Sequence, residues 1–259
     1  MTKKSEIALL IPHFNQLHRL EKSLETINFS ENLLVIIVDD GSDAEQKPVE
    51  NWRRSMEARI GFRVHLISHD KNEGIEVALN SGLSYIFTSL DAKYIARLDC
   101  GDYNVQNRFD RQYEFMEANT DVCLVGSWAD VSENNRPLYT IRTPSTHHEI
   151  QKRMLINNCF IHPTVMFRTA AAREVALYPR ASPASEDYAY FFLFVKRFIL
   201  ANIPEVLVHL PKYDEGISRK RRKTQLISRI RINLHNFRLD WNSVRGLLTN
   251  SFLLVVPIG

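Results

Sequence analysis

The sequence predicts an α/β fold with a mostly parallel central sheet that is flanked by helices. Apolar runs at residues 7–12, 33–38 and 94–98 lack polar alternation, which is typical of strands covered on both faces. The segments between such runs repeat apolar residues at spacings of three and four, the period of an amphipathic helix. Strand–helix–strand repetition of this kind favours parallel strands joined by right-handed crossovers.

The first hundred residues alternate predicted strands and helices. Strands are expected at 7–12, 33–38, 62–68 and 94–99. Helices are expected at 15–27, where Leu17, Leu20, Leu24 and Ile27 share a face, and at 74–87. Two strands end in acids and glycine, "VDDGS" and "LDCGD", at the sheet edge where α/β proteins bind ligands.

The second part of the chain continues with less regular alternation. Helices are expected at 107–119, 147–159 and 185–198, with Ser185 as the N-cap of the last one. Strands are expected at 122–131, 162–168 and 202–210. We expect one domain over residues 1–215, followed by a basic, amphipathic helical extension over 216–259.

Composition excludes several classes of protein. The chain is 44% hydrophobic and 24% charged, as in ordinary soluble domains. Its three cysteines are odd in number and form no CxxC pair, which argues for a reducing compartment and against zinc or a disulfide framework. The net charge of +3 is uneven, because residues 217–245 hold nine basic residues and one acid, and the rest holds 24 basic residues and 29 acids.

Five segments, taken in order, resemble the family 2 glycosyltransferases of the GT-A fold. They are "IALLIPHFNQ…LLVIIVDDGS", "KNEGIEVALNSGL", "YIARLDCGD", "IHPTVMFR" and "ASEDYAYFFLFVK". The resemblance covers roughly residues 5–225 and is nearest to bacterial transferases that build lipopolysaccharide or capsule. It implies an inverting hexosyl- or hexosaminyltransferase with a nucleoside-diphosphate sugar donor, UDP-sugar favoured. The acceptor would be lipopolysaccharide, capsule or a lipid-linked saccharide.

The resemblance assigns the donor nucleotide to the first strands. Asp40 is expected to accept a hydrogen bond from the nucleobase, a role that suits an acceptor-only carboxylate. Phe14, with Pro12 before it, is placed to pack on the base. Asp99 is expected at the ribose–diphosphate region. Asp39 is expected to support the loop, and capping of the following turn is the other interpretation of both acids.

"LDCGD" stands where the family has its Asp-x-Asp motif, so Mn²⁺ or Mg²⁺ is the expected cofactor, with Asp99 and Asp102 as ligands. Gly101 replaces the usual second acid. Tyr213 occupies the place of a histidine that the family often adds before its last loop. Metal dependence therefore stays open on two grounds.

A basic run follows the last predicted strand, where the family has a loop that closes over the donor. Ser218, Arg219 and Lys220 are its nearest residues, and cations here can stabilise a diphosphate leaving group. A solvated basic face or a membrane contact explains the same residues equally well.

The acceptor side is assigned to the remaining segments. In the family's "ED" pair the second acid is the catalytic base, which is Asp187 here, and Glu186 orients the acceptor. His162 and Trp128 are expected on the acceptor or sugar side. Simple structural roles remain open for these residues: helix N-terminal acids, a satisfied histidine and a packed indole.

The tail and the rival functions complete the expectations. Nine cations before the apolar run 246–258 predict an anchor on an anionic membrane, on the inner face of the cytoplasmic membrane. Docking of this helix on the domain itself is the alternative. A non-catalytic nucleotide-binding relative and a sugar-phosphate nucleotidyltransferase are the rival functions. The acidic body argues against nucleic acid.

Overall fold

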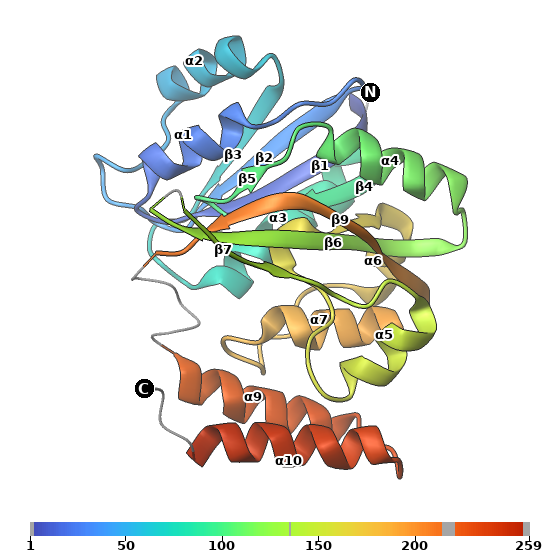
Figure 1. The fold of residues 1–259 in the computed structure, drawn as a ribbon. Helices are drawn as coiled ribbons and strands as arrows, with labels where there is room; N and C mark the ends of the chain where they lie inside the picture. The colour runs from blue at the N-terminus through green and yellow to red at the C-terminus, as the bar shows by residue number, and fades with distance from the viewer. Residues whose placement is uncertain (1–2, 135, 214–220, 256–259) are drawn as a thin grey trace.

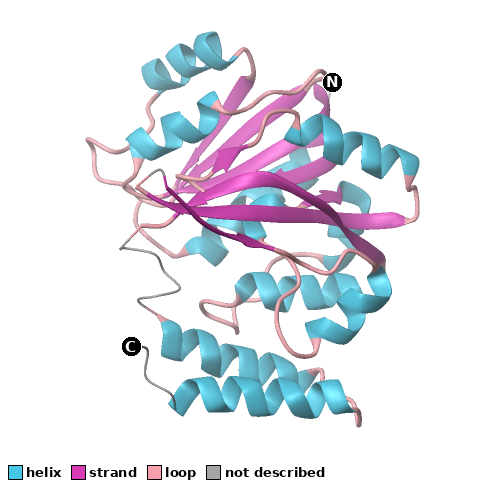
Figure 2. Ribbon diagram, in the orientation of Figure 1, coloured by secondary structure: helices cyan, strands magenta, loops and turns pink. Residues whose placement is uncertain are grey.

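The strands of the structure form one curved sheet with helices on both of its faces (Figures 1 and 2). The computed structural model describes residues 3–134, 136–213 and 221–255. The strands are β1 (Lys3–His13), β2 (Leu33–Asp39), β3 (Arg63–Ser68), β4 (Leu90–Arg97), β5 (Tyr103–Asn104), β6 (Val122–Glu133), β7 (Arg136–Ile141), β8 (Met166–Arg168) and β9 (Ile199–Pro211).

The helices are α1 (Leu17–Glu25), α2 (Glu50–Ile60), α3 (Ile75–Ser89), α4 (Arg108–Ala118), α5 (His147–Met154), α6 (Thr169–Val175), α7 (Glu186–Val195), α9 (Arg222–His235) and α10 (Trp241–Val255). A 3₁₀ turn, η1, spans His162–Thr164. The strand order within the described residues is β3-β2-β1-β4-β8-β6-β9-β5, with β7 paired to β6. Strands β3, β2, β1 and β4 are parallel, and β8 runs antiparallel to both of its neighbours. The predicted α/β fold with a mostly parallel sheet is therefore confirmed.

The parallel half explains the unbroken apolar runs of the sequence. In β1, Ala8 and Leu10 face the core that α3 and α7 cover, and Leu9 and Ile11 face the other core, which α1 covers. Both faces of the strand are buried along residues 7–11, so this part of it is entirely apolar. Residues of β2 alternate between the two cores in the same way.

Several predicted elements differ in detail from the structure. Helix α1 ends at Glu25, and Ile27 is buried in the connection that follows it. The predicted strand 162–168 is divided, because the Pro163 region forms η1 and only residues 166–168 pair with β4 and β6. Ser185 is at the N-cap position of α7, but its hydroxyl donates to the Gln225 carbonyl instead of capping the helix (3.3 Å).

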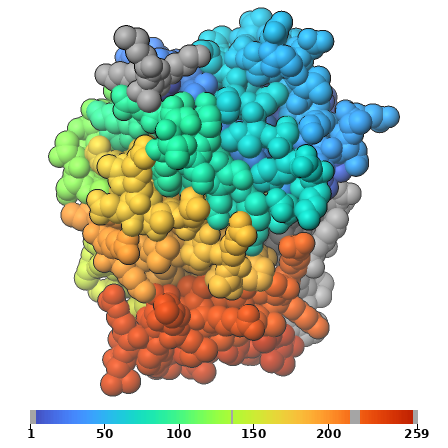
Figure 3. All heavy atoms as spheres, turned by 180° about the vertical axis from the view of Figure 1, so that it is seen from behind, coloured from blue at the N-terminus to red at the C-terminus, as the bar shows by residue number. Residues whose placement is uncertain are grey.

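The C-terminal helices α9 and α10 pack against each other and against the body of the molecule (Figure 3). Ile232 of α9 belongs to the core that α7 lines. The Tyr188 hydroxyl of α7 donates to Asn233 Oδ1 at 2.7 Å, and Asn250 Nδ2 of α10 donates to the Ile156 carbonyl at 3.1 Å. No helix in the described residues combines the length and hydropathy needed to cross a membrane. The predicted domain boundary at 215–216 lies outside the described residues.

Candidate active site

A cavity of about 520 Å³ opens at the carboxyl edge of the parallel strands. Strands β1, β2 and β4 end at it, and the residues before α3, α7 and α9 complete its wall. Five residues predicted from the sequence line it: Pro12, Phe14, Asp40, Asp99 and Glu186. The sequence had assigned no role there to Gln16, Asn72, Glu76 and Arg221, which line it too.

The end of β1 is joined to the end of β2 by a buried histidine–carboxylate pair. His13 Nδ1 donates to Asp39 Oδ1 at 2.9 Å, and its Nε2 accepts from the Gln16 amide at 3.2 Å. Burial alone would raise the pKa of Asp39, but hydrogen bonds from His13 and Ser42 bring that pKa below its ordinary value. Asp39 therefore stays ionised and supports the turn beside the cavity, as the sequence predicted.

Asp40 fixes the loop between β3 and α3. Its Oδ1 accepts from the Glu73 amide at 3.0 Å and from His69 Nδ1 at 2.9 Å, and its Oδ2 accepts from the Gly74 amide at 2.8 Å. A carboxylate has about four acceptor positions, so one more hydrogen bond can still be accepted from a ligand in the cavity. Asp40 therefore stabilises the loop before α3, which forms part of the cavity wall, and also lines the cavity itself. The exposed ring of Phe14 lines the same cavity.

Asp99 is paired with the first of three buried polar side chains, none of which lines the cavity: Arg97, His162 and Tyr178. Its Oδ1 accepts from Arg97 Nη2 at 2.6 Å, and Arg97 is fully buried. Arg97 also hydrogen-bonds the Leu10 carbonyl of β1 and contacts His162 Nε2 at 3.4 Å. Tyr178 in turn hydrogen-bonds His162 Nε2 at 2.9 Å. Burial and the charge of Arg97 hold the pKa of His162 well below its ordinary value, so this imidazole is neutral.

Two adjacent acids, Glu186 and Asp187, begin helix α7, and their different surroundings give them different pKa values. The Glu186 carboxyl lines the cavity, and its Oε2 is buried without a hydrogen-bond partner in the described residues. Burial, reinforced by the neighbouring Asp187, raises the pKa of Glu186 to about 8. Burial raises the pKa of Asp187 to about 6, against the opposing hydrogen bond from the Tyr188 amide. At neutral pH the first carboxyl is therefore protonated and the second is ionised.

Asp187 is oriented by the chain around it. Its Oδ2 accepts from Asn158 Nδ2 at 2.8 Å, and its Oδ1 accepts from the Tyr188 amide at 2.7 Å. Asn158 is itself fixed, because its Oδ1 accepts from the Phe160 amide at 3.1 Å. The positive charge of Arg229 on α9 also favours the ionised form of Asp187. Asp187 itself does not line the cavity; its neighbour Glu186 does. The arrangement can hold one ionised carboxylate next to a cavity-lining residue, as a base for proton abstraction.

Comparison with known proteins now identifies the family. The family model described as "Glycosyl transferase family 2" matches residues 8–176, more than half of the chain. The chain belongs to glycosyltransferase family 2. The resemblance read from the sequence is thus confirmed.

Individual relatives of this family 2 glycosyltransferase agree with that assignment. A UDP-Gal:alpha-D-GlcNAc-diphosphoundecaprenol beta-1,3-galactosyltransferase of Escherichia coli is 28% identical over 231 residues, covering 86% of this chain and 80% of the relative. The Staphylococcus aureus TarS 1–349 structure with UDP-GlcNAc has a TM-score of 0.69 at 14% identity, covering 96% of this chain and 73% of the neighbour. A Pyrobaculum calidifontis mannosyltransferase, PcManGT, was solved with GDP-Man and Mn²⁺. Its TM-score is 0.66 at 13% identity, covering 98% of this chain and 70% of that one. The solved structures confirm the fold.

The two predicted metal ligands, Asp99 and Asp102, are not grouped with a further acid, histidine or cysteine in the described residues. Asp99 is already paired with Arg97, and Gly101 offers no side chain. Burial, with the nearby charge of Asp99, raises the pKa of Asp102 well above its ordinary value, so this acid resists ionisation. The described residues contain no group of three or more His, Cys, Asp or Glu side chains that could hold a metal ion. The oxygen-rich ligand set that Mg²⁺ or Mn²⁺ requires is not assembled by these residues.

The other predicted residues lie apart from the cavity or outside the described chain. His162 is buried behind Asp99, in contact with Arg97 and Tyr178. Trp128 of β6 donates its Nε1–H to the Thr143 carbonyl at 3.1 Å and does not line the cavity. Ser218, Arg219 and Lys220 lie outside the described residues. The next residue of the same basic run, Arg221, does line the cavity.

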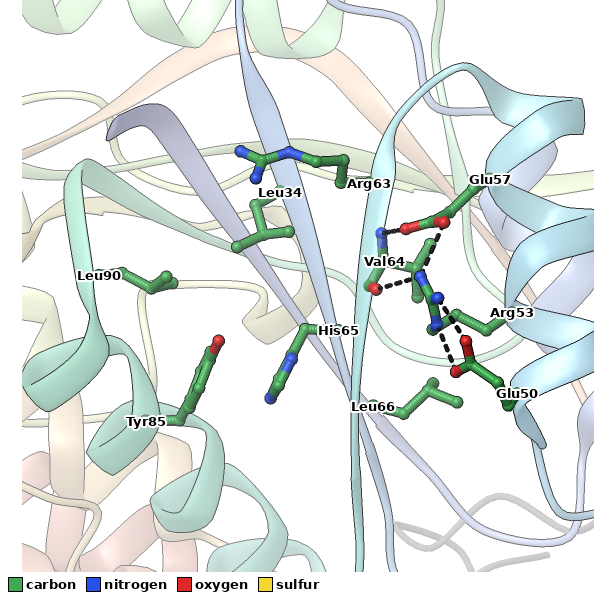
Figure 4. A pocket seen from close by; sticks show the side chains of 10 residues that line it. All are labelled: Leu34, Glu50, Arg53, Glu57, Arg63, Val64, His65, Leu66, Tyr85 and Leu90. Atoms are coloured by element: carbon green, nitrogen blue, oxygen red, sulfur yellow. Dashed lines mark hydrogen bonds and ion pairs between the residues drawn. The ribbon is translucent and has the colours of Figure 1, made fainter. Parts of the chain in front are cut away.

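A second cavity, of about 360 Å³, lies at the free edge of β3 and carries different chemistry (Figure 4). Glu57 Oε1 accepts from the Val64 amide at 2.7 Å, and Arg53 Nη1 donates to the Val64 carbonyl at 3.4 Å. His65 and Tyr85 stack with ring centroids 3.9 Å apart. The charged side chains of α2 thus cover an edge strand, which is how proteins protect such edges from pairing with other chains. We assign this cavity a structural role.

The sequence did not identify three residues that bind the predicted site residues or shift their pKa values. Arg97 had been read as part of a buried strand, although an arginine inside an apolar run followed by an acid is a signal for a buried ion pair. Asn158 had been placed inside a helix, yet α5 ends at Met154 and leaves this amide free to hold Asp187. Arg229 had been counted only as part of the basic tail.

Proposed function

We propose that this glycosyltransferase moves one sugar, with inversion at the anomeric carbon, from a nucleoside-diphosphate sugar to a lipid-linked saccharide of a cell-surface glycan. The observation that carries the proposal is the pair of buried acids at the start of α7, whose pKa values are both raised and unequal, and of which Glu186 lines the cavity at the carboxyl edge of the sheet. A UDP-sugar is the favoured donor. The name of the E. coli relative and the UDP-GlcNAc bound by TarS support that choice.

In the proposed reaction Asp187 is the base. Its carboxylate takes the proton of an acceptor hydroxyl while the hydroxyl oxygen forms a bond to the anomeric carbon of the donor sugar. The bond between that carbon and the β-phosphate oxygen breaks on the opposite side. The nucleoside diphosphate leaves with the bonding electrons, and the proton remains on Asp187. Asn158 keeps the carboxylate oriented throughout.

Glu186 is proposed to bind sugar rather than to act as a second base. Its protonated carboxyl can donate one hydrogen bond and accept another, which matches a sugar hydroxyl. The unpartnered Oε2 at the cavity wall is available for that contact. A buried oxygen without a partner is costly in the free protein, so a ligand hydroxyl would relieve the cost.

The nucleotide is proposed to lie against β1, β2 and β4. Phe14 and Pro12 would contact the base, and the remaining acceptor position of Asp40 would receive its N–H. Asp99, held by Arg97, would bind the ribose hydroxyls. Neither Trp128 nor His162 lines the cavity. We propose that both contribute to the acceptor side of the site indirectly, by packing against residues that contact the acceptor. Ser218, Arg219 and Lys220 keep their proposed role over the diphosphate.

A membrane-surface location on the inner face of the cytoplasmic membrane is part of the proposal, and the C-terminal helices support it. Leu239, in the connection between α9 and α10, is 98% exposed, and Trp241, the first residue of α10, is 72% exposed. Phe252 and Val255 are exposed near the end of α10. Exposed apolar side chains beside many arginines suit a surface of anionic lipid.

The test is a donor and acceptor screen with the full chain. UDP-Gal, UDP-GlcNAc, UDP-Glc and GDP-Man are each offered with a lipid-diphosphate-linked GlcNAc, and both released nucleoside diphosphate and product linkage are measured. We expect a β-linked product from an α-linked donor, and its loss in Asp187→Asn. Retention of the anomeric configuration, or full transfer by Asp187→Asn, would reject the mechanism. Nucleotide binding without any turnover would favour the non-catalytic alternative. Release of pyrophosphate in a separate incubation with UTP and a sugar 1-phosphate would favour a nucleotidyltransferase.

Membrane association is tested separately by sedimentation with vesicles. The wild-type chain is expected to bind vesicles that contain phosphatidylglycerol more strongly than pure phosphatidylcholine vesicles. The double variant Leu239→Ser/Trp241→Ser should lose binding, whereas Tyr139→Ser, at an exposed aromatic residue on β7, should not. Equal binding by all three proteins would contradict the assignment of this surface.

A further inference from the structure

The two positions at which this chain departs from its family's metal motif touch each other in space. Gly101 stands in place of the second acid, and Tyr213 stands in place of the expected histidine. The Tyr213 hydroxyl donates to the Gly101 carbonyl at 3.1 Å, across 112 positions of sequence. The two departures therefore form a single structural unit beside Asp99.

The backbone and the tyrosine ring together exclude a side chain at position 101. Gly101 has φ +98°, a conformation that residues with a Cβ rarely adopt. A Cβ placed there would lie 3.1 Å from Tyr213 Cε2. The space in which an aspartate would approach a cation is thus filled by the phenol ring.

A guanidinium group occupies the other side of this ring. Arg19 Cζ lies 3.8 Å from the centroid of Tyr213, in a cation–π contact. Its Cδ lies 3.5 Å from the position of the missing Cβ at Gly101. Its Nη1 contacts Gln16 Oε1 at 3.4 Å, and Gln16 lines the large cavity. The guanidinium group is therefore held beside Gly101 and next to Gln16 of the cavity wall, although Arg19 itself does not line the cavity.

Arg19 has no acidic partner among the residues that the structure describes. In residues 3–134, 136–213 and 221–255 no carboxylate forms an ion pair with it, in contrast to Arg97, whose charge is met by Asp99. A half-buried arginine without an acidic partner is ready to bind an anion. Guanidinium binds phosphate oxygens through two parallel N–H donors, and stacking on an aromatic ring orients the group for that contact.

We propose that Arg19, oriented by Tyr213 over Gly101, supplies the positive charge against the donor diphosphate in place of a divalent cation. Nucleotide binding is then independent of metal. The inference rests on the proposed function, since it requires a nucleoside-diphosphate donor. Arg19 is a binding residue for the leaving group, and Tyr213 is a positioning residue. Arg221, which lines the same cavity from the start of the tail, would add to this charge without depending on Tyr213.

The test measures equilibrium binding by calorimetry on the full-length chain. UDP, dTDP, GDP and CDP are screened first, and the best of them is compared with its monophosphate, in EDTA and in MnCl₂. Wild-type affinity for the diphosphate is expected to agree within about twofold in the two buffers. Arg19→Gln should lose about tenfold in diphosphate affinity, and much less for the monophosphate. Arg19→Lys should fall between them, and Tyr213→Leu, which removes the ring that orients the guanidinium, should lose diphosphate affinity in the same direction as Arg19→Gln.

Different results would contradict this inference and the proposed function, and a variant far from the site serves as the control. Arg63→Gln, at an arginine that lines the second cavity, should leave both affinities unchanged. A tenfold gain from Mn²⁺ in the wild type, or unchanged diphosphate binding by Arg19→Gln, would overturn the inference while leaving the proposed function intact. If no nucleotide binds in either buffer, the proposed function fails and the inference with it. Should Arg19→Gln not fold, the Mn²⁺ comparison on the wild type and on Arg19→Lys still decides.

Discussion

Replacing Glu186 by glutamine is expected to stabilise the protein, and the gain should grow with pH. The pKa of this carboxyl rises from 4.5 to about 8 on folding, chiefly through burial. The folded state therefore binds the proton more tightly than the unfolded state. Stability from this group is fully present below about pH 4.5 and is lost as pH rises toward about 8.

The magnitude follows from the two pKa values. Each pKa unit corresponds to about 1.4 kcal/mol. At about pH 7 the unfolded chain is ionised at this position and the folded chain is protonated, which costs on the order of 3 kcal/mol of folding free energy. At about pH 5 the same calculation gives a cost in folding free energy of less than about 1 kcal/mol. Glutamine is neutral and close in shape, so Glu186→Gln removes the cost at every pH.

The assay is urea unfolding of the wild type and Glu186→Gln at several values between about pH 5 and pH 8. The expected result is a stability difference that is small at the acid end and increases steadily toward the alkaline end. Glu45→Gln, at an exposed carboxylate, serves as the control and should show a constant small difference. A difference for Glu186→Gln that does not change with pH would refute the assignment of a proton to this buried carboxyl.

Four further outcomes are expected. Asp187→Asn should lower the transfer rate about 10²–10⁴-fold while leaving nucleotide binding within about twofold, as measured by product formation and calorimetry. Wild-type transfer should rise with pH as Asp187 ionises, with an apparent pKa of about 6 in a rate profile. Arg229→Gln removes a positive charge that favours the ionised form, so the acid limb of that profile should move to higher pH. Gly101→Ala should destabilise the fold by about 1–3 kcal/mol in urea unfolding, because φ is +98° and the Tyr213 ring is close.

The parallel half of the sheet was predictable because each strand there carries its own signal. The strands β1 and β2 are buried on both faces, so their apolar runs are unbroken, and the end of β2 is marked by two acids. Helix α2 was missed because only Met56 among its residues is buried, and the rest of the segment is polar. The strand predicted at 162–168 was wrong at its start, since Pro163 and Thr164 close a 3₁₀ turn within an otherwise apolar run.

The site was predictable in its residue types and not in its electrostatics. Asp40, Asp99 and Glu186 were placed at the cavity from their positions after strands or before a helix. Their protonation and partners depend on contacts across long stretches of chain. Asp40 accepts hydrogen bonds from residues 33 and 34 positions away, and Asn158 reaches Asp187 across 29 positions. Local patterns carry no information about such pairings.

The contact between Gly101 and Tyr213 changes what each substitution means. Taken alone, each removes one expected metal ligand and leaves open whether another residue replaces it. Taken together they are sterically coupled, because the ring that hydrogen-bonds the Gly101 carbonyl also fills the space that a side chain at 101 would need. Restoring the acid alone would strain the backbone and displace the ring, and restoring histidine alone would remove the surface on which Arg19 lies. The proposed arginine arrangement therefore depends on both positions together, and a substitution at either one is expected to disturb it.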